Sequence, residues 1–255
     1  RSVLVTGVQT CALPILEGKK VVKMIDFHTH ILPGIDDGSR NSEESIQMLN
    51  LEQEQGITKI VFTPHFYANR NSVERFLKRR EASYERLLSK VPEKLVKDIQ
   101  FCRGAEVYYF PGIGEAEEIS RLCVEETGVM MLEMPFCQWD DQVVRDVQTL
   151  INKQKLTVII VHIERYYPYQ KKKEFWERVF ELPVYAQVNA ESFLHFRTRR
   201  KAFMLFEAYN ALLGTDCHNV TNRIPNMQQA REVIQKKLGA DRLRRVDELG
   251  EMILP

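Results

Sequence analysis

The sequence of 255 residues has no apolar run of about 18 residues, the length that a membrane-spanning helix needs, so we expect no membrane insertion. Its five cysteines are an odd number without a C-x-x-C pair, which argues against a disulfide framework and against a thiolate zinc site. A reducing, cytoplasmic location fits this cysteine usage best. The chain also lacks repeats, low-complexity tracts and linkers rich in proline, glycine or serine. These absences favour one large domain with a sizeable core.

The first residues differ in character from the rest. The stretch "VTGVQTCALPI" (residues 5–15) resembles the translation of a sequencing-adapter oligonucleotide, and it lacks the charged start and the cleavage site of a signal peptide. We expect residues 1–23 to be a non-native or unstructured extension, Met24 to be the natural start, and residues 24–255 to form the domain. Without the extension the chain has 32 basic and 34 acidic residues, a net charge of −2. This balance, without a basic run, argues against nucleic-acid binding.

Seven short apolar runs have the composition of buried β-strands. They cover residues 21–28, 57–64, 99–107, 128–135, 156–163, 184–189 and 211–216. Between them we predict helices over residues 42–55, 72–91, 141–154, 171–180, 197–210 and 226–238. Asn41 and Glu44 predict a capping box for the first helix, and Gly56 predicts its end. The alternation predicts an α/β fold with a parallel sheet, and seven units favour a barrel over the alternative, an open doubly wound sheet.

Histidines and carboxylates are concentrated near the ends of these predicted strands. Five of the six histidines and four acidic residues lie there: His28, His30, His65, His162, His218, Asp37, Glu106, Glu133 and Asp216. In a β/α barrel the C-terminal strand ends meet at one mouth, so we expect these side chains to meet. A single histidine at a strand end is more often a packed or surface residue, but the coincidence of nine favours a site for two or three divalent ions. Imidazole and carboxylate ligands suit manganese, iron, zinc or magnesium.

The motifs around these residues resemble a known family. The segments "DFHTH", "IDDG", "TPH", "GAE", "LEM", "VHIERY" and "GTDCHN" occur in the order and spacing of the PHP (polymerase and histidinol phosphatase) superfamily. Within it, "HIERY" (162–166) and "SEES" (42–45) resemble the manganese-dependent bacterial tyrosine-protein phosphatases of capsule and exopolysaccharide gene clusters. The resemblance extends from Met24 to the C-terminus.

The resemblance implies a distorted (β/α)7 barrel with a trinuclear site, most often manganese, held by the nine residues named above at the C-terminal strand ends. It prefers Asp37 to Asp36, because the family ligand directly precedes a glycine, here Gly38. It also implies that two arginines, Arg165 and Arg223, contact the phosphoryl group as catalytic residues. The segment "FYANRN" after His65 is less basic than in some relatives, which leaves the substrate contacts there open.

The implied activity is hydrolysis of phosphotyrosine in a protein partner, by resemblance the tyrosine-rich tail of a bacterial tyrosine kinase that controls exopolysaccharide synthesis or export. One alternative is a histidinol-phosphatase-like enzyme acting on a small phosphate monoester with the same metals. A nuclease is disfavoured by the charge balance. A non-catalytic metal-binding regulator is the alternative outside enzymes, and the full set of ligands and arginines argues against it.

Three further signals have competing interpretations. Cys217 and Arg223 have the C-x5-R spacing of cysteine-dependent tyrosine phosphatases, but the loop between them has no glycine to cradle a phosphate, so we interpret the spacing as coincidence. The sixth histidine, His195, lies in a polar stretch and is expected at the surface. Several aromatic residues follow predicted strands and could contact a substrate ring or simply pack at the rim: Tyr67, Trp139, Tyr166, Tyr167 and Tyr169.

Overall fold

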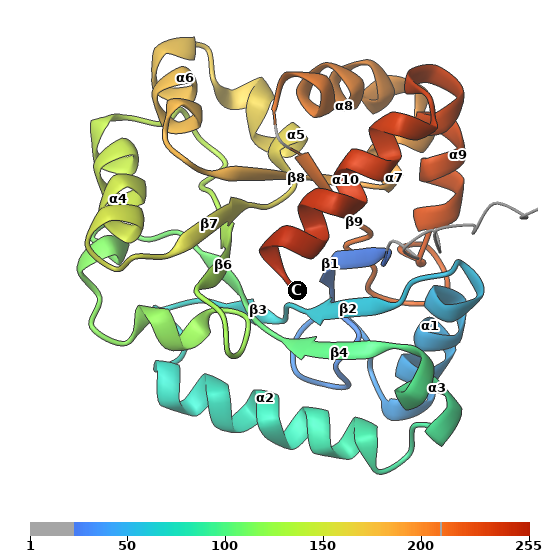
Figure 1. The fold of residues 1–255 in the computed structure, drawn as a ribbon. Helices are drawn as coiled ribbons and strands as arrows, with labels where there is room; N and C mark the ends of the chain where they lie inside the picture. Colours follow the sequence, from blue (N-terminus) through green and yellow to red (C-terminus); the bar gives the residue numbers. More distant parts are fainter. Residues whose placement is uncertain (1–22, 210) are drawn as a thin grey trace, which may run out of the picture.

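The computed structural model describes residues 23–209 and 211–255, so the prediction for residues 1–22 lies outside the described part. Within that part the centre of the molecule is built from parallel strands surrounded by helices (Figure 1). The strands are β1 (Ile25–Thr29), β2 (Lys59–Phe62), β3 (His65–Phe66), β4 (Gln100–Arg103), β5 (Glu106–Tyr108), β6 (Val129–Glu133), β7 (Thr157–Ile160), β8 (Tyr185–Asn189) and β9 (Ala211–Gly214). Each predicted run therefore contains at least one strand.

The strands pair into two sheets, in the orders β1-β2-β4 and β3-β5-β6-β7-β8-β9, and every pairing is parallel. The chain changes sheet twice: between β2 and β3 at Pro64, where the predicted run 57–64 ends, and between β4 and β5 at Gly104, within the predicted run 99–107. Proline has no amide hydrogen for a strand ladder, which explains the first break. A single parallel bridge between Thr29 and Cys217 links β1 to the segment after β9. The parallel α/β prediction is confirmed, whereas the strand pairing forms two sheets rather than one closed ring of seven.

Helices cover the outside of these sheets. They are α1 (Ser42–Glu54), α2 (Val73–Leu88), α3 (Glu93–Asp98), α4 (Asp141–Asn152), α5 (Ile163–Tyr166), α6 (Lys173–Glu181), α7 (Glu191–Leu194), α8 (Phe196–Ala208), α9 (Met227–Leu238) and α10 (Ala240–Ile253), with 3-10 turns η1 (Ile113–Glu115), η2 (Ile119–Leu122) and η3 (Tyr167–Tyr169). The six predicted helices are present to within a few residues. No helix of the described part is both long and apolar enough to cross a bilayer.

The start of α1 confirms half of the predicted capping box. The Asn41 side chain accepts a hydrogen bond from the Glu44 amide at 2.9 Å. The Glu44 carboxylate, however, accepts from the amide of Arg40 at 2.9 Å. The prediction that it would accept from the amide of Asn41 is therefore wrong. Gly56 follows the helix with a φ of 83°, a left-handed conformation that glycine adopts without strain.

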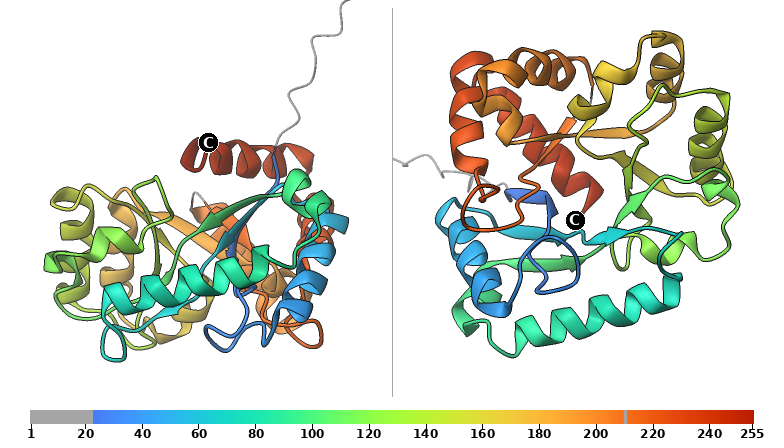
Figure 2. Two further views of the ribbon diagram at one scale, coloured as in Figure 1. Left: turned by 90° about the horizontal axis from the view of Figure 1, so that it is seen from below. Right: turned by 180° about the vertical axis from the view of Figure 1, so that it is seen from behind.

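Helix α10 was not predicted, and it closes the end of the molecule opposite the site. Figure 2 shows α10 lying across one end of the strands, while the loops that follow several strands project from the other end. Gly250 lets the helix approach β1, because a Cβ atom there would lie 3.1 Å from the Phe27 ring. The buried ammonium of Lys59, at the start of β2, donates to the carbonyl oxygens of Leu254 and Pro255 at 2.7 and 2.8 Å. Helix α10 and the residues after it therefore cover β1 and β2 at the end opposite the loops that follow the strands.

Candidate metal centre

All nine predicted side chains meet at the C-terminal ends of the strands. Their ligand atoms form four overlapping groups, each with atoms within 4.8 Å of one another: His30, Asp37, His65 and His218; His28, His30 and Asp216; His28, Glu106 and His162; His65, Glu106 and Glu133. Seven of the nine side chains are buried, His65 is partly exposed and Asp37 is exposed. The predicted convergence is confirmed, and ligation of a metal by these residues stays a prediction.

Glu106 lies at the centre of this nine-residue cluster. Its Oε2 atom lies 3.2 Å from Nε2 of His28, 3.2 Å from Nε2 of His30 and 2.9 Å from Nδ1 of His65. Its Oε1 atom lies 2.7 Å from Nε2 of His162. One buried carboxylate thus faces four imidazoles, which is the placement required of a carboxylate that bridges two cations.

The polar atoms of the cluster are poorly satisfied by hydrogen bonds alone. The Nε2 atoms of His28 and His30 lie 3.1 Å apart, and two ring nitrogens can share only one proton in such a contact. Several buried atoms have no partner of hydrogen-bond geometry, among them His65 Nδ1, Glu106 Oε2, Glu133 Oε2 and His218 Nε2. Buried polar atoms without partners are rare, and convergent imidazole and carboxylate donors are the ligands that divalent cations prefer. The residues therefore fit a metal centre.

Two ligand candidates have strained backbone conformations. Among the described residues, four that are not glycine have positive φ, and two of these are His162 (31°) and Asp216 (53°). Left-handed backbone costs free energy for such residues and is concentrated at functional sites. At His162 it turns the imidazole from the end of β7 toward Glu106 before α5 begins.

Neighbouring polar residues orient the ligand side chains. Gln187 Oε1 accepts from the amide of His162 at 2.8 Å and lies 3.2 Å from Nδ1 of His28. Gln187 Nε2 donates to Asn189 Oδ1 at 2.9 Å, and Asn189 Nδ2 donates to Asp216 Oδ2 at 2.8 Å. These partners fix the ring and carboxylate orientations, as outer partners do in metal sites. The sequence prediction missed both amides, although they occupy alternate positions on β8, the one run without a predicted ligand.

Asp36 and Asp37 have different roles. Asp36 lies 2.8 Å from Nδ1 of His30 and accepts from the amide of His65 at 3.1 Å, so it orients two ligands. Asp37 points toward the cluster, with Oδ1 at 3.4 Å from Nε2 of His65 and 3.6 Å from Nε2 of His218. This placement supports the preference for Asp37 as the ligand.

Neighbouring carboxylates raise the pKa values of His30 and His65. Burial alone would lower the pKa of His30, but its interaction with Asp36 raises the pKa to about 9. Burial likewise opposes protonation of His65, yet its interactions with the carboxylates of Asp37 and Glu106 raise its pKa to about 11. A divalent cation that binds here must displace such protons.

The pKa values of His162 and Glu133 are shifted so that both groups favour their neutral forms. Burial lowers the pKa of His162 to about 4, and the nearby charge of Arg165 acts in the same direction. Burial raises the pKa of Glu133 to about 7, and the charge of Glu106 adds to this shift. A neutral imidazole is the form that binds a metal ion, so His162 is ready for ligation near neutral pH.

Both predicted arginines lie against the cluster through Asp216. Arg165 Nη2 lies 2.5 Å from Asp216 Oδ2, and Arg223 Nη2 lies 2.8 Å from Asp216 Oδ1. Their side chains are 37% and 32% exposed, so each guanidinium also faces solvent at the mouth of the site. The structure therefore places both where an anion above the cluster would be in reach.

The exposure of Cys217 and His195 decides between the alternative interpretations of these two residues. Cys217 is fully buried, and its Sγ lies 3.7 Å from Glu52 Oε1. Burial raises the pKa of this thiol well above its ordinary value, which opposes formation of a nucleophilic thiolate. His195 is exposed and lies 2.9 Å from Glu191, as a surface histidine. The interpretation of the C-x5-R spacing as coincidence is supported.

The aromatic candidates divide by exposure. Trp139 and Tyr166 are fully buried, so the interpretation that they contact a substrate ring is wrong and they pack in the core. Tyr169 is 46% exposed. The prediction missed Phe136, which follows β6 and is 39% exposed; its ring lies 6.3 Å from that of His162.

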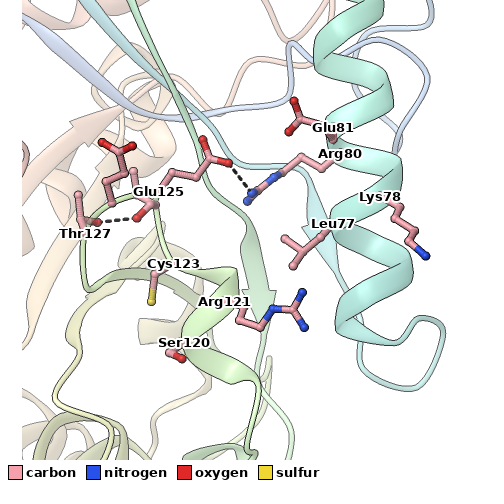
Figure 3. A pocket seen from close by; sticks show the side chains of 11 residues that line it. Leu77, Lys78, Arg80, Glu81, Ser120, Arg121, Cys123, Glu125 and Thr127 are labelled. Atoms are coloured by element: carbon pink, nitrogen blue, oxygen red, sulfur yellow. Dashed lines mark hydrogen bonds and ion pairs between the residues drawn. The ribbon is translucent and has the colours of Figure 1, made fainter.

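A separate cavity of about 510 Å³ lies between α2 and the loop after η2 (Figure 3). Its buried Arg80 donates to the carbonyl of Gly104 at 2.9 Å and to Glu125 at 3.0 Å. It contains none of the nine cluster residues, and its arginine is held by neighbouring groups. We interpret it as a structural feature of the surface.

Comparison with known proteins identifies clear relatives. The family described as "Capsular polysaccharide synthesis, CpsB/CapC" matches residues 24–249. The tyrosine-protein phosphatase CpsB of Streptococcus pneumoniae is 26% identical over 234 residues, covering 85% of this chain and 92% of that protein. The tyrosine-protein phosphatase YwqE of Bacillus subtilis is 28% identical over 245 residues, covering 91% of each.

Solved structures share the fold. A structure from a study of YwqE and CpsB, described as unique metal-dependent tyrosine phosphatases, superposes with a TM-score of 0.77 at 23% identity, covering 91% of this chain and 94% of that one. A mutant organophosphorus hydrolase superposes with a TM-score of 0.52 at 11% identity, covering 91% and 93%. The fold is therefore one that is found in metal-dependent hydrolases.

Proposed function

The chain belongs to the CpsB/CapC family of capsular polysaccharide synthesis, and on this basis we propose that it is a metal-dependent phosphatase that hydrolyses phosphotyrosine in proteins. The observation that carries the proposal is the meeting of nine imidazole and carboxylate side chains beside two arginines that are about one-third exposed. The names of the curated relatives agree with it.

We propose that residues 24–255 form one PHP-type catalytic domain, a distorted (β/α)7 barrel, and that residues 1–23 are a non-native extension. Two or three divalent ions, manganese first, with iron, zinc or magnesium as alternatives, would be held by His28, His30, Asp37, His65, Glu106, Glu133, His162, Asp216 and His218. When bound, such ions supply hydroxide near neutral pH and neutralise phosphoryl oxygens. Glu106 would be the central carboxylate of this set, because its two oxygens face four imidazoles.

Arg165 and Arg223 would bind the phosphoryl group. Each guanidinium carries five N–H donors, and in each case the bonds to Asp216 use only Nη2. The other donors are free to bind phosphoryl oxygens while Asp216 holds the planes in position. Planar, bidentate donation matches the charge that spreads over these oxygens in the transition state.

The openness of the mouth favours a protein substrate over a small metabolite. The Asp37 side chain is 66% exposed, and both arginines are about one-third exposed, so a side chain presented on a peptide can reach the cluster. Tyrosinate needs less protonation on leaving than an alkoxide does, so a dedicated general acid is unnecessary. By family resemblance the partner is the tyrosine-rich tail of a bacterial tyrosine kinase that controls exopolysaccharide synthesis or export, which would place the reaction in the cytoplasm.

A substrate comparison tests the proposal. The protein purified from Met24 with manganese should release phosphate from a phosphotyrosine peptide faster than from a phosphoserine peptide or histidinol phosphate. Preference for histidinol phosphate would transfer the assignment to a small-molecule phosphatase. Activity that survives a strong chelator but is lost in Cys217→Ser would contradict the metal-dependent mechanism.

A further inference from the structure

We propose that the ring of the target phosphotyrosine binds in a cavity beside the metal centre whose aromatic wall is formed by Phe136 and Tyr169; this inference rests on the proposed function. The cavity has a volume of about 570 Å³. That is within the range of about 300–1,000 Å³ that is usual for small-ligand sites. Its lining includes Phe136, Arg165, Pro168, Tyr169, Asn189 and Lys201. We call it the aryl cavity.

The aryl cavity adjoins the position where the phosphoryl group would lie. Arg165 and Asn189, both in its lining, each donate to Oδ2 of Asp216, at 2.5 and 2.8 Å. On the other side, the Phe136 ring stacks at 22° on the imidazole of His162. The aromatic ring of a phosphotyrosine is joined directly to the ester oxygen, so a phosphoryl group at the cluster places the ring at this wall.

Two exposed aromatic rings border this one cavity. Large apolar side chains that are exposed number eight in the described part, and Phe136 and Tyr169 are the two that line the aryl cavity. Single exposed apolar residues are common and need no explanation. These two rings pack together edge to face, with centroids 6.0 Å apart at 78°, and so present a continuous aromatic surface beside a cationic arginine.

The wall is held rigid from behind. The Phe136 ring packs on the fully buried Tyr166 at a centroid distance of 5.0 Å, and Tyr166 Oη accepts from the amide of Met134 at 3.1 Å. The buried Gln170 clamps the loop that follows Phe136, since its Nε2 donates to the carbonyl of Cys137 and its Oε1 accepts from the amide of Trp139. A preorganised ring loses little entropy when an aromatic ligand stacks on it.

The chemistry of this surface selects an aryl ester over an alkyl ester. An aromatic pair contributes about 0.5–1.5 kcal/mol beyond the burial of apolar area, which corresponds to a preference of about two- to tenfold. A short alkyl group at the same phosphoryl position gains no such contact. Phe136 is therefore proposed as a specificity-determining residue, and the nine ligands and two arginines serve either class of ester.

The affinities of two non-hydrolysable probes, each measured separately, test the cavity without any catalytic step. With the manganese-loaded protein, the dissociation constants of phenylphosphonate and methylphosphonate are measured by calorimetry for wild type, Phe136→Ala, Phe136→Leu and Phe136→Tyr. The phenyl-to-methyl affinity ratio should fall about three- to tenfold in Phe136→Ala, fall less in Phe136→Leu, and recover in Phe136→Tyr. Phe196→Ala removes a 92% exposed phenylalanine outside the cavity lining and should leave the ratio unchanged.

An unchanged ratio in Phe136→Ala overturns the inference, and so does an equal loss of both affinities, because the ring would then only support His162. If Phe136→Ala loses its metal or does not fold, the ratio in Phe136→Leu decides by the same criterion. The proposed function is judged separately on the wild type. If the wild type binds phenylphosphonate through Phe136 but does not hydrolyse phosphotyrosine peptide, the proposed aryl cavity is supported and the proposed function is contradicted.

Discussion

Replacing Gln187 by leucine should damage the metal centre without removing any ligand. The leucine keeps the volume but leaves the amide of His162 without its acceptor at 2.8 Å, and it removes the contact at 3.2 Å to Nδ1 of His28. Both groups are buried, and a buried polar group without a partner costs about 1–3 kcal/mol. We therefore expect the metal-free protein to lose about 2–6 kcal/mol in free energy of unfolding.

The same change should lower manganese affinity about 10- to 100-fold, the usual effect of losing an outer partner of a ligating histidine. Urea unfolding of chelated protein measures the first effect, and calorimetric titration with manganese measures the second. In Gln187→Glu the carboxylate can still accept from the amide of His162, but an acceptor replaces the donor at 2.9 Å from Asn189 Oδ1, so this variant should also lose stability. Manganese affinity within twofold of wild type in Gln187→Leu would refute the role assigned to this amide.

Three other perturbations address the arginines, the loop before α1 and the protons of the cluster. Arg165→Ala and Arg223→Ala should each lower turnover by about a hundredfold with metal content unchanged, and near-full turnover in both would remove their assigned role. Gly38→Ala would place a Cβ atom 2.2 Å from the carbonyl oxygen of His30 and should weaken manganese binding, whereas Gly128→Ala, with its nearest contact at 3.7 Å, should not. Because the pKa values of His30 and His65 are about 9 and about 11 in the metal-free state, manganese must displace protons at neutral pH, and affinity should rise from neutral pH to beyond about 9. Calorimetry in two buffers of different ionisation enthalpy would detect the released protons, and their absence would contradict this.

Most residues of the site could be predicted from the sequence, because metal ions are bound by a small set of side-chain types. Imidazoles and carboxylates at strand ends could be recognised from type and position alone, and all nine meet in the structure. Gln187 and Asn189 were missed because amides are common in strands and carry no charge to single them out. Their alternate spacing on a run that lacked a ligand was the one available signal.

Strands and helices could be predicted where a local residue pattern marks them. Features that depend on tertiary packing could not. The strand runs were found from apolar composition, but the change of sheet at Pro64 and at Gly104 depends on how both halves pair with neighbours. Helix α10 is highly charged and contains Gly250, which weakens its helical signal. Its stability comes from packing on Phe27 and from the bonds of Lys59 to the chain end.

Aromatic contacts also required the structure. Tyr166 and Phe136 follow neighbouring strands and look alike as sequence signals, yet one is fully buried and the other is 39% exposed above His162. Which ring reaches solvent depends on the path of each loop, here fixed by Gln170. Burial of a single side chain in a loop is a tertiary property that residue type does not determine.

The central claim is that nine side chains from six segments of the chain hold shared cations. Anomalous diffraction from crystals grown with manganese would test it most directly. We expect two or three manganese peaks among the nine side chains, with Glu106 in contact with more than one of them. Absence of any peak at saturating manganese, or peaks bound elsewhere while these side chains remain paired with one another, would contradict the account.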